Sequence, residues 1–236
     1  MPVFQLTDKL IFPPAELAEK NGLLAIGGDL SPERLLLAYR SGIFPWYSEG
    51  DPILWWSPSP RLVIFPAEFK IPKRLSRLER QGKYTVTMNH AYRQVITACA
   101  TTDKRQGKCT WITGEMIEAY CTLHDMGYAH SVECWLDDKL AGGLYGISLG
   151  SIFFGESMYS KQPNSSKIGL VHLVKKLQEW NFDLIDCQMK TEHLMQFGAR
   201  EIPGTEFQEV LGKSIVQDDH KGKWQSSYLQ KATILA

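Results

Sequence analysis

The chain has 236 residues, and its 26 Lys and Arg balance 26 Asp and Glu, so its formal net charge at pH 7 is zero. With 44% hydrophobic and 11% aromatic residues it has the composition of a folded protein, long enough for one large domain or two smaller ones. It shows no stretch of ~20 apolar residues, no secretory signal and no C-x-x-C pair, so we expect a cytoplasmic protein without a membrane helix, a disulfide framework or a zinc site.

The N-terminal quarter is rich in turn signals and aromatic residues. Ser31 and Pro32 are typical of the cap and the first turn of a helix, which Gly42 would end. The segment that follows, GIFPWYSEGDPILWWSPSPR, contains four Pro and three Trp and is too interrupted for a long regular element. We predict a small N-terminal α+β domain over residues 1–62.

Residues 63–236 alternate between helical and strand patterns. The expected strands are residues 84–88 and the stretches HSVECWL, KLAGGLYGISLG, SIFFGES and FDLIDCQM. Asn89 and Thr113 are candidate caps of two helices, and residues 164–166 offer caps for a third. Helices followed by a strand meander, a helix and a strand resemble the order of elements in an acetyltransferase-like (GNAT-like) α+β fold.

The zero net charge hides a strong polarity along the chain. Residues 1–60 have a net charge of −3, residues 61–110 of +8, residues 111–160 of −6 and the remaining residues of +1. Pro72 fits the first turn of a helix in the basic segment, and the cations of this helix share one broad face. They are Lys70, Lys73, Arg74, Arg77 and Arg80. This face is either a solvated surface or a stripe that contacts nucleic-acid phosphates.

Two of the expected strands end in polar residues that are poor core residues. Strand alternation places Asp186 and Gln188 on one face of FDLIDCQM, and it places Glu156 at the end of an apolar face of SIFFGES. Each acid either takes part in chemistry or turns to solvent or caps a helix. Trp46 and Trp111 lie in turn-rich segments, where an exposed ring can stack on a base, the alternative being core packing.

Five stretches together resemble the leucyl/phenylalanyl-tRNA–protein transferase family. They are NGLLAIGGDLSPERLLLAYRSGIFPWY, DPILWWSPSPR, TWITGEMIEAYCTLHDMGYAHSVECW, FFGESMYSKQPNSSKIGL and LIDCQMKTEHLMQFGAREIP. They extend from about residue 21 to residue 203, which is most of the chain. The succession of GGDLSP, GIFPW, WWSP, GESM and DCQ is highly specific, although none of these motifs would be specific alone.

The resemblance implies an enzyme that transfers Leu, Phe or, less readily, Met from aminoacyl-tRNA. The acceptor would be the N-terminal α-amine of proteins beginning with Arg or Lys, which are thereby marked for N-end-rule degradation. It also implies a small N-terminal domain joined to an acetyltransferase-like domain, without a cofactor or a metal. We expect a monomer.

By the same resemblance, Asp186 and Gln188 match the reaction centre, and Glu156 matches the acid at the acceptor and aminoacyl site. Trp111 matches an aromatic residue near the terminal adenosine, and Trp46 lies in the matching N-terminal motif. The pocket for the transferred side chain would include Leu144, Leu170, Leu173, Leu177 and Ile185.

Charge and chemistry extend these assignments. We expect the basic helix to contact the tRNA backbone through Lys73, Arg74, Arg77 and Arg80. Glu156 would contribute to recognition of the cationic acceptor. Because an amide is a very weak base, we expect the Gln188 carbonyl to orient the acceptor amine while the charge of Asp186 polarises that contact.

Two other functions remain open. An acetyl-coenzyme A acetyltransferase of the same fold would need a Gly-rich pyrophosphate loop, which YSKQPNSSKIG lacks. A noncatalytic RNA-binding module would use the basic helix and exposed Trp residues. That module would have no use for the acidic segment or for the strand that contains Asp186 and Gln188.

Overall fold

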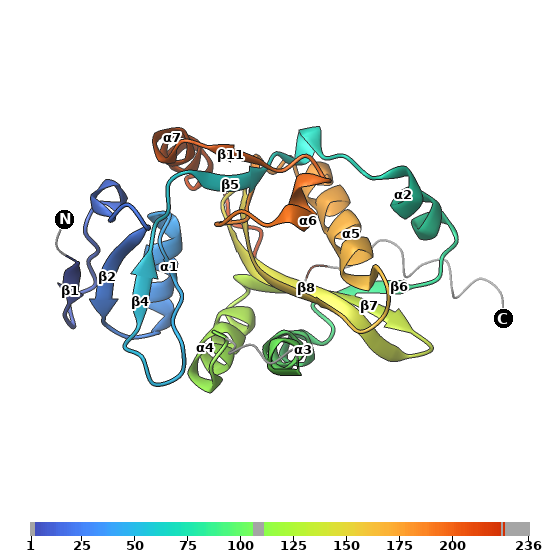
Figure 1. Cartoon of the computed structure of the whole chain (residues 1–236), viewed down its shortest axis with the longest axis horizontal. Coiled ribbons are helices and arrows are strands. Elements are labelled where there is room, and N and C mark those ends of the chain that lie inside the picture. The colour runs from blue at the N-terminus through green and yellow to red at the C-terminus, as the bar shows by residue number, and fades with distance from the viewer. Residues whose placement is uncertain (1–2, 106–110, 223, 225–236) are drawn as a thin grey trace.

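The computed structural model describes residues 3–105, 111–222 and 224, with the side chains of residues 103–105 excepted. Within these residues a small N-terminal sheet with one α-helix lies beside a larger sheet with helices on both of its faces (Figure 1). This arrangement confirms the predicted α+β class, with a small N-terminal domain and a sheet-rich C-terminal domain. No helix in the described ranges combines the length and the apolar sequence that crossing a membrane requires.

The N-terminal sheet has the strand order β1-β2-β4-β3. Its elements are β1 (Phe4–Leu6), the 3-10 helix η1 (Ala15–Leu17), β2 (Leu23–Gly27), α1 (Pro32–Arg40), β3 (Phe44–Pro45) and β4 (Leu54–Trp56). The predicted start of α1 is confirmed, because the Ser31 hydroxyl accepts a hydrogen bond from the Arg34 N–H at 3.4 Å. Gly42, with φ +73°, follows the end of the helix.

The C-terminal sheet has the strand order β11-β5-β10-β9-β8-β7-β6. Its strands are β5 (Arg61–Ile64), β6 (Thr85–Met88), β7 (Ala129–Leu136), β8 (Lys139–Leu149), β9 (Ile152–Ser160), β10 (Leu184–Asp186) and β11 (Arg200–Ile202). Within this sheet β10 runs parallel to β9 and antiparallel to β5. The sheet therefore brings the end of the predicted reaction-centre strand next to the strand that leaves the N-terminal domain.

Helices cover both faces of this sheet. They are η2 (Pro66–Glu68), α2 (Lys73–Arg80), α3 (Tyr92–Arg105), α4 (Gly114–Asp125), α5 (Ser165–Glu179), α6 (Glu192–Met195) and α7 (Gly204–Ser214). Figure 1 shows α3 and α4 on one face of the β7–β8 meander and α5 on the other. The core accordingly has two parts, one continuous with the N-terminal domain and the other beneath α5.

Local cap signals are correct for α4 and wrong for α3. The Thr113 hydroxyl accepts a hydrogen bond from the Met116 N–H at 3.2 Å and caps α4 as predicted. Asn89 instead bonds to the backbone of the neighbouring strand, and the Ala91 N–H just before α3 donates to the buried carboxylate of Glu133 at 3.2 Å. An acid from β7 thus takes the place of the expected cap, which the local sequence cannot show.

Candidate active site

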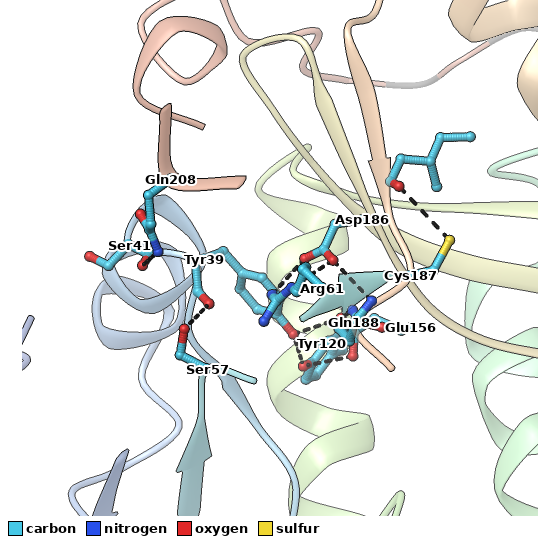
Figure 2. A network of polar contacts seen from close by, with 12 residues as sticks. Tyr39, Ser41, Ser57, Arg61, Tyr120, Glu156, Asp186, Cys187, Gln188 and Gln208 are labelled. Atoms are coloured by element: carbon cyan, nitrogen blue, oxygen red, sulfur yellow. Dashed lines mark hydrogen bonds and ion pairs between the residues drawn. The ribbon is translucent and has the colours of Figure 1, made fainter. Parts of the chain in front are cut away.

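A buried ion pair joins the two strands at the end of the C-terminal sheet that faces the N-terminal domain. Arg61 on β5 donates from Nε to Asp186 Oδ1 at 2.8 Å and from Nη2 to Oδ2 at 2.7 Å (Figure 2). The two side chains are only 1% and 0% exposed. Two parallel charge-assisted hydrogen bonds fix both groups in one geometry and compensate part of the cost of removing two charges from water.

Aromatic rings enclose the same guanidinium. Its carbon lies 5.0 Å from the ring centre of Phe44 on β3 and 4.6 Å from that of Phe207 on α7. Both distances lie within the range of a cation–π interaction. Arg61 therefore contacts the N-terminal domain, the end of β10 and α7 at once.

Gln188 lies beyond the end of β10, so the prediction that it shares a strand face with Asp186 is wrong. The strand ends at Asp186, and Gln188 adopts a left-handed backbone with φ +55°. Its backbone N–H donates to Asp186 Oδ1 at 2.9 Å, which is the contact of an Asx turn. This turn joins the Gln188 backbone to the carboxylate that pairs with Arg61.

The Gln188 side chain meets a second carboxyl group, that of Glu156 (Figure 2). Gln188 Nε2 donates to Glu156 Oε1 at 3.4 Å. Tyr39 on α1 donates to the same oxygen at 2.8 Å, and Tyr120 on α4 donates to Oε2 at 3.2 Å. The two tyrosine hydroxyls also lie within hydrogen-bond distance of each other. Each phenol has one hydrogen, so beside an ionised Glu156 only two of these three contacts can hold a proton at a time. Glu156 lies where the pairing of β8 with β9 shifts register, and such a bulge redirects a side chain.

The environment of Glu156 shifts its protonation toward neutral pH. Burial, reinforced by the negative charge of Asp186, raises the pKa of Glu156 to about 7, although the two tyrosine hydrogen bonds and Arg61 oppose this shift. Burial also raises the pKa values of Tyr39 and Tyr120 well above 10, with the Glu156 charge adding to the effect. Both tyrosines therefore stay protonated as donors, while Glu156 can gain and lose a proton near pH 7.

Two cavities meet at these side chains. The first has a volume of about 250 Å³ and a mainly apolar lining that includes Leu144, Leu170, Leu173, Ile185 and Met158. The second has a volume of about 230 Å³ and is lined by Phe44, Pro45, Trp46, Trp111, Met189 and Thr191. Glu156, Cys187 and Gln188 line both cavities and form the boundary between them, together with Thr191.

The structure thus brings together most of the residues singled out in the sequence. Trp46 and Trp111, 65 positions apart in the chain, line one cavity beside Glu156 and Gln188. Leu177 is fully buried in the core beneath α5 and is not among the described residues that line the apolar cavity. Asp186 is likewise not among the described residues that line either cavity.

The basic helix α2 lies apart from these cavities. Its side chains Lys73, Arg74, Arg77 and Arg80 are exposed, as expected for a surface that contacts a partner or solvent. A separate polar hollow of about 620 Å³ is lined by Arg74 and Arg77 and by Lys167 at the start of α5. Among the described residues, no group of three or more His, Cys, Asp or Glu side chains is suited to hold a metal ion.

Sequence reasoning missed three residues of the site. Arg61 is the final residue of the stretch DPILWWSPSPR and was given no role of its own. It is the single charged residue between Asp51 and Glu68, and this isolation could have indicated a special role. Tyr39 and Tyr120 occupy apolar positions of two helices and resemble ordinary core residues. Their hydroxyl partners belong to other elements and become visible only in the folded chain.

Comparison with known proteins identifies the family. The family model described as leucyl/phenylalanyl-tRNA protein transferase matches residues 63–212, and the model of its N-terminal domain matches residues 28–59. The chain belongs to the leucyl/phenylalanyl-tRNA–protein transferase family. It is an aminoacyltransferase, and the first matched region contains the Arg61-facing Asp186 together with Glu156 and Gln188.

Curated members of this transferase family match nearly the whole chain. A leucyl/phenylalanyl-tRNA–protein transferase of Syntrophobacter fumaroxidans is 54% identical over 225 residues, covering 95% of this chain and 96% of the relative. One of Desulforapulum autotrophicum is 54% identical over 95% of this chain and 98% of its own length. One of Syntrophotalea carbinolica is 51% identical, with 96% and 100% covered.

Solved structures with some likeness to this transferase are more distant. The C-terminal domain of a putative lysylphosphatidylglycerol synthetase from Agrobacterium fabrum has a TM-score of 0.38 and 11% identity, covering 67% of this chain and 51% of that one. L-PGS from Bacillus licheniformis has a TM-score of 0.38 and 14% identity, covering 85% and 66%.

The buried ion pair generates a prediction about stability. Arg61→Met leaves the Asp186 charge without its partner, which costs about 3–5 kcal/mol for a buried pair and corresponds to a fall of roughly 6–20 °C in melting temperature. Thermal unfolding followed by circular dichroism measures this effect. Arg61→Met combined with Asp186→Asn should recover part of the loss, since no unpaired charge remains.

The matched control for this prediction is Arg93→Met. Arg93 also donates two hydrogen bonds to one carboxylate, that of Glu118, but both side chains are more than half exposed. Exposed pairs contribute little to stability, so the melting temperature should hardly change. Equal losses for Arg61→Met and Arg93→Met would contradict the role assigned to burial.

Proposed function

We propose that this transferase moves Leu or Phe, and less readily Met, from aminoacyl-tRNA to the N-terminal α-amine of proteins that begin with Arg or Lys. The observation that supports this most directly is the meeting of an apolar cavity and an aromatic cavity at Glu156 and Gln188. Such a junction suits an aminoacyl ester whose side chain, carbonyl and nucleoside must be held separately. The proposal includes a GNAT-like C-terminal domain, a cytoplasmic monomer and a role in N-end-rule degradation.

The apolar cavity would receive the side chain of the transferred amino acid. Leu144 from β8, Leu170 and Leu173 from α5 and Ile185 from β10 line it, and its volume is about 250 Å³. Apolar pockets discriminate by only ~1–3 kcal/mol per methylene. A graded preference among Leu, Phe and Met follows from this limit.

The aromatic cavity would receive the terminal adenosine of the tRNA. Trp46 comes from the N-terminal domain and Trp111 from the segment before α4, and both rings border the same space. Stacking of a base on an aromatic side chain contributes ~1–3 kcal/mol without requiring a particular sequence. This contact would place the ester bond near Glu156 and Gln188.

Alignment of the two substrates can supply much of the acceleration of this reaction. The ester is already activated, and with an α-amino pKa of ~8 roughly a tenth of acceptor amines are neutral at pH 7. Orientation of two reactants can contribute up to ~7–11 kcal/mol. Because the Gln188 NH₂ group faces Glu156, its carbonyl oxygen is the group that would accept a hydrogen bond from the amine. No cofactor is needed for this step.

Asp186 would act on this step indirectly, as a positioning residue. Its carboxylate bonds to the Gln188 backbone and to Arg61. We therefore propose that Asp186 controls the backbone turn at Gln188. This role replaces the expected one, in which the charge of Asp186 polarises the contact between the Gln188 amide and the acceptor amine. For the acceptor, we propose that the acidic segment 111–160 favours a cationic N-terminal residue, and that Glu156 contributes to its recognition at the α-amine.

The exposed basic helix would contact the tRNA backbone. Lys73, Arg74, Arg77 and Arg80 project from α2, and the hollow beside Arg74 and Arg77 also includes Lys167. The segment 61–110 thus complements a polyanion, while the segment 111–160 complements a cation.

A transfer assay tests the proposed function. Purified protein is mixed with radiolabelled Leu-tRNA and a peptide that begins with Arg, and the expected result is label in the peptide. Retention of tRNA without transfer would instead identify a noncatalytic binding module. Acetyl transfer from acetyl-coenzyme A, with no transfer from Leu-tRNA, would identify an acetyltransferase.

The apolar cavity predicts a change in donor preference. Leu170→Ala enlarges the cavity and should raise the ratio of Phe to Leu transfer by ~10-fold or more, as expected for removing methylenes from a hydrophobic pocket. Competition between Phe-tRNA and Leu-tRNA measures this ratio. Leu177→Ala, on the same helix and also buried but not among the described residues that line the cavity, should leave the ratio unchanged. A similar shift in both variants would place the side-chain pocket elsewhere.

The basic helix predicts a change in salt dependence. Replacing Lys73, Arg74 and Arg77 together by Ala should weaken tRNA binding and reduce the slope of log affinity against log salt by up to about 2–3, if each cation contacts one phosphate. Filter binding at several salt concentrations measures both. The control replaces three exposed lysines outside α2, namely Lys20, Lys139 and Lys213. An unchanged slope in the α2 variant would identify this face as a solvated surface.

A further inference from the structure

We propose that Glu156 is the proton acceptor of the transfer reaction, and that Tyr39 and Tyr120 are positioning residues that hold its carboxyl group at the boundary of the two cavities. This inference rests on the proposed function and deepens it, since aminolysis of an ester must remove a proton from the attacking amine. The inference names the Glu156 carboxylate as the group that accepts this proton.

The position of Glu156 distinguishes it from other groups that bind protons. Among the described residues that line the two cavities it is the one carboxylic acid, and it borders both. Asp186 is 0% exposed and bound at both oxygens by Arg61, so protonating it would break the ion pair. Burial raises the pKa of the Cys187 thiol, which keeps that group protonated. His193 borders only the apolar cavity, where its ring contacts the Met158 sulfur.

The hydrogen bonds of Glu156 leave room for a substrate. Oε1 accepts from Tyr39 and Gln188, and Oε2 accepts from Tyr120. A carboxylate has about four acceptor positions, so three donors leave one for the N–H of an incoming amine. The donors come from α1, α4 and the segment after β10, which fixes the carboxyl from three directions.

The surroundings suit a base that works near neutral pH. The ionisable groups that influence Glu156, or are influenced by it, come from every element packed around it. They are Tyr39, Arg61, Tyr92, Tyr120, Tyr145 and Asp186. Burial, together with Tyr39, Tyr120, Asp186 and Arg61, gives Glu156 its pKa of about 7. A general base is most effective when its pKa lies near the working pH. Below about pH 7 Glu156 becomes protonated, and transfer should slow.

In the proposed step, a proton of the attacking amine is carried by Glu156 to the ribose oxygen that leaves. The lone pair of the neutral α-amine attacks the ester carbonyl carbon and forms the C–N bond, while the Gln188 carbonyl holds one amine N–H. Glu156 takes a proton from the amine nitrogen. Collapse of the tetrahedral intermediate breaks the C–O bond to the ribose, and the proton passes from Glu156 to that ribose oxygen. The products are an amide and a deacylated tRNA, and Glu156 is again a carboxylate.

The first test is Glu156→Gln, which preserves the shape of the side chain and removes its ability to accept a proton. Single-turnover transfer from preformed Leu-tRNA to a saturating peptide beginning with Arg is measured on both sides of neutral pH. We expect the rate to fall by ~10²–10⁴-fold with tRNA binding unchanged. A full rate at saturation, with only a higher KM for the peptide, would overturn the inference and leave Glu156 as a recognition group.

The second test uses the positioning residues, because a merely structural role would not move a pH profile. Tyr39→Phe and Tyr120→Phe each remove a hydroxyl that lowers the pKa of Glu156. The fall of the transfer rate on the acid side of the pH profile, the acidic limb, should therefore move to higher pH. Most of the rate should be retained at pH values above this limb. Tyr159→Phe removes a buried hydroxyl outside this network and should leave the limb in place. An unmoved limb in both network variants would overturn the inference.

A third measurement excludes titration of the acceptor as the source of the limb. Two peptides with different α-amine pKa values are compared at saturation with the unchanged enzyme. A limb that follows the peptide and not the tyrosine variants would overturn the assignment to Glu156. Failure of the proposed function looks different, since the unchanged enzyme would then transfer no label at any pH.

Discussion

The site depends on the ion pair between Arg61 and Asp186. Two charges removed from water are stable only while both hydrogen bonds remain, so the pair fixes the side chains of Arg61 and Asp186 across the paired strands β5 and β10. Phe44 and Phe207 enclose the guanidinium and are fixed by the same group. The Asx turn at Gln188 bonds its backbone to the buried Asp186 carboxylate. The position of Asp186 therefore determines where the Gln188 side chain lies at the cavity boundary.

The site contains two acidic side chains, and their environments separate their roles. Asp186 is paired with a permanent cation. It is not among the described residues that line either cavity. Glu156 is surrounded by neutral donors, two phenols and an amide, which stabilise its charge far less than a guanidinium would. One acid therefore maintains geometry, and the other remains free to change its protonation near pH 7.

The parts of the fold that were predictable depend on local sequence. Ser31 and Thr113 cap their helices as expected, because a cap needs only a side chain and an N–H two or three residues away. The predictions for Asn89 and for the strand through Gln188 failed because distant groups decide them. The carboxylate that replaces Asn89 comes from Glu133, more than 40 positions along the chain. Strand periodicity gave no sign of the turn at Gln188.

The predictability of the site follows the same rule. The residues that match family motifs, such as Glu156 and Trp111, were found by resemblance, and the fold brings them to one place. Arg61 was missed because its partner is 125 positions away. The tyrosine pair was missed because a phenol in an apolar helix position is indistinguishable from core until its hydroxyl partner is known.

The position of the N-terminal domain has a consequence for how such a protein can vary. Tyr39, Phe44 and Trp46 come from that domain, yet each contacts groups of the C-terminal sheet or borders the cavity that includes them. Neither domain contains a complete site, so exchanging one domain for that of a distant relative would disrupt the site even if both folded normally. The seam between the domains is thus expected to evolve as one unit, with substitutions on one side compensated on the other.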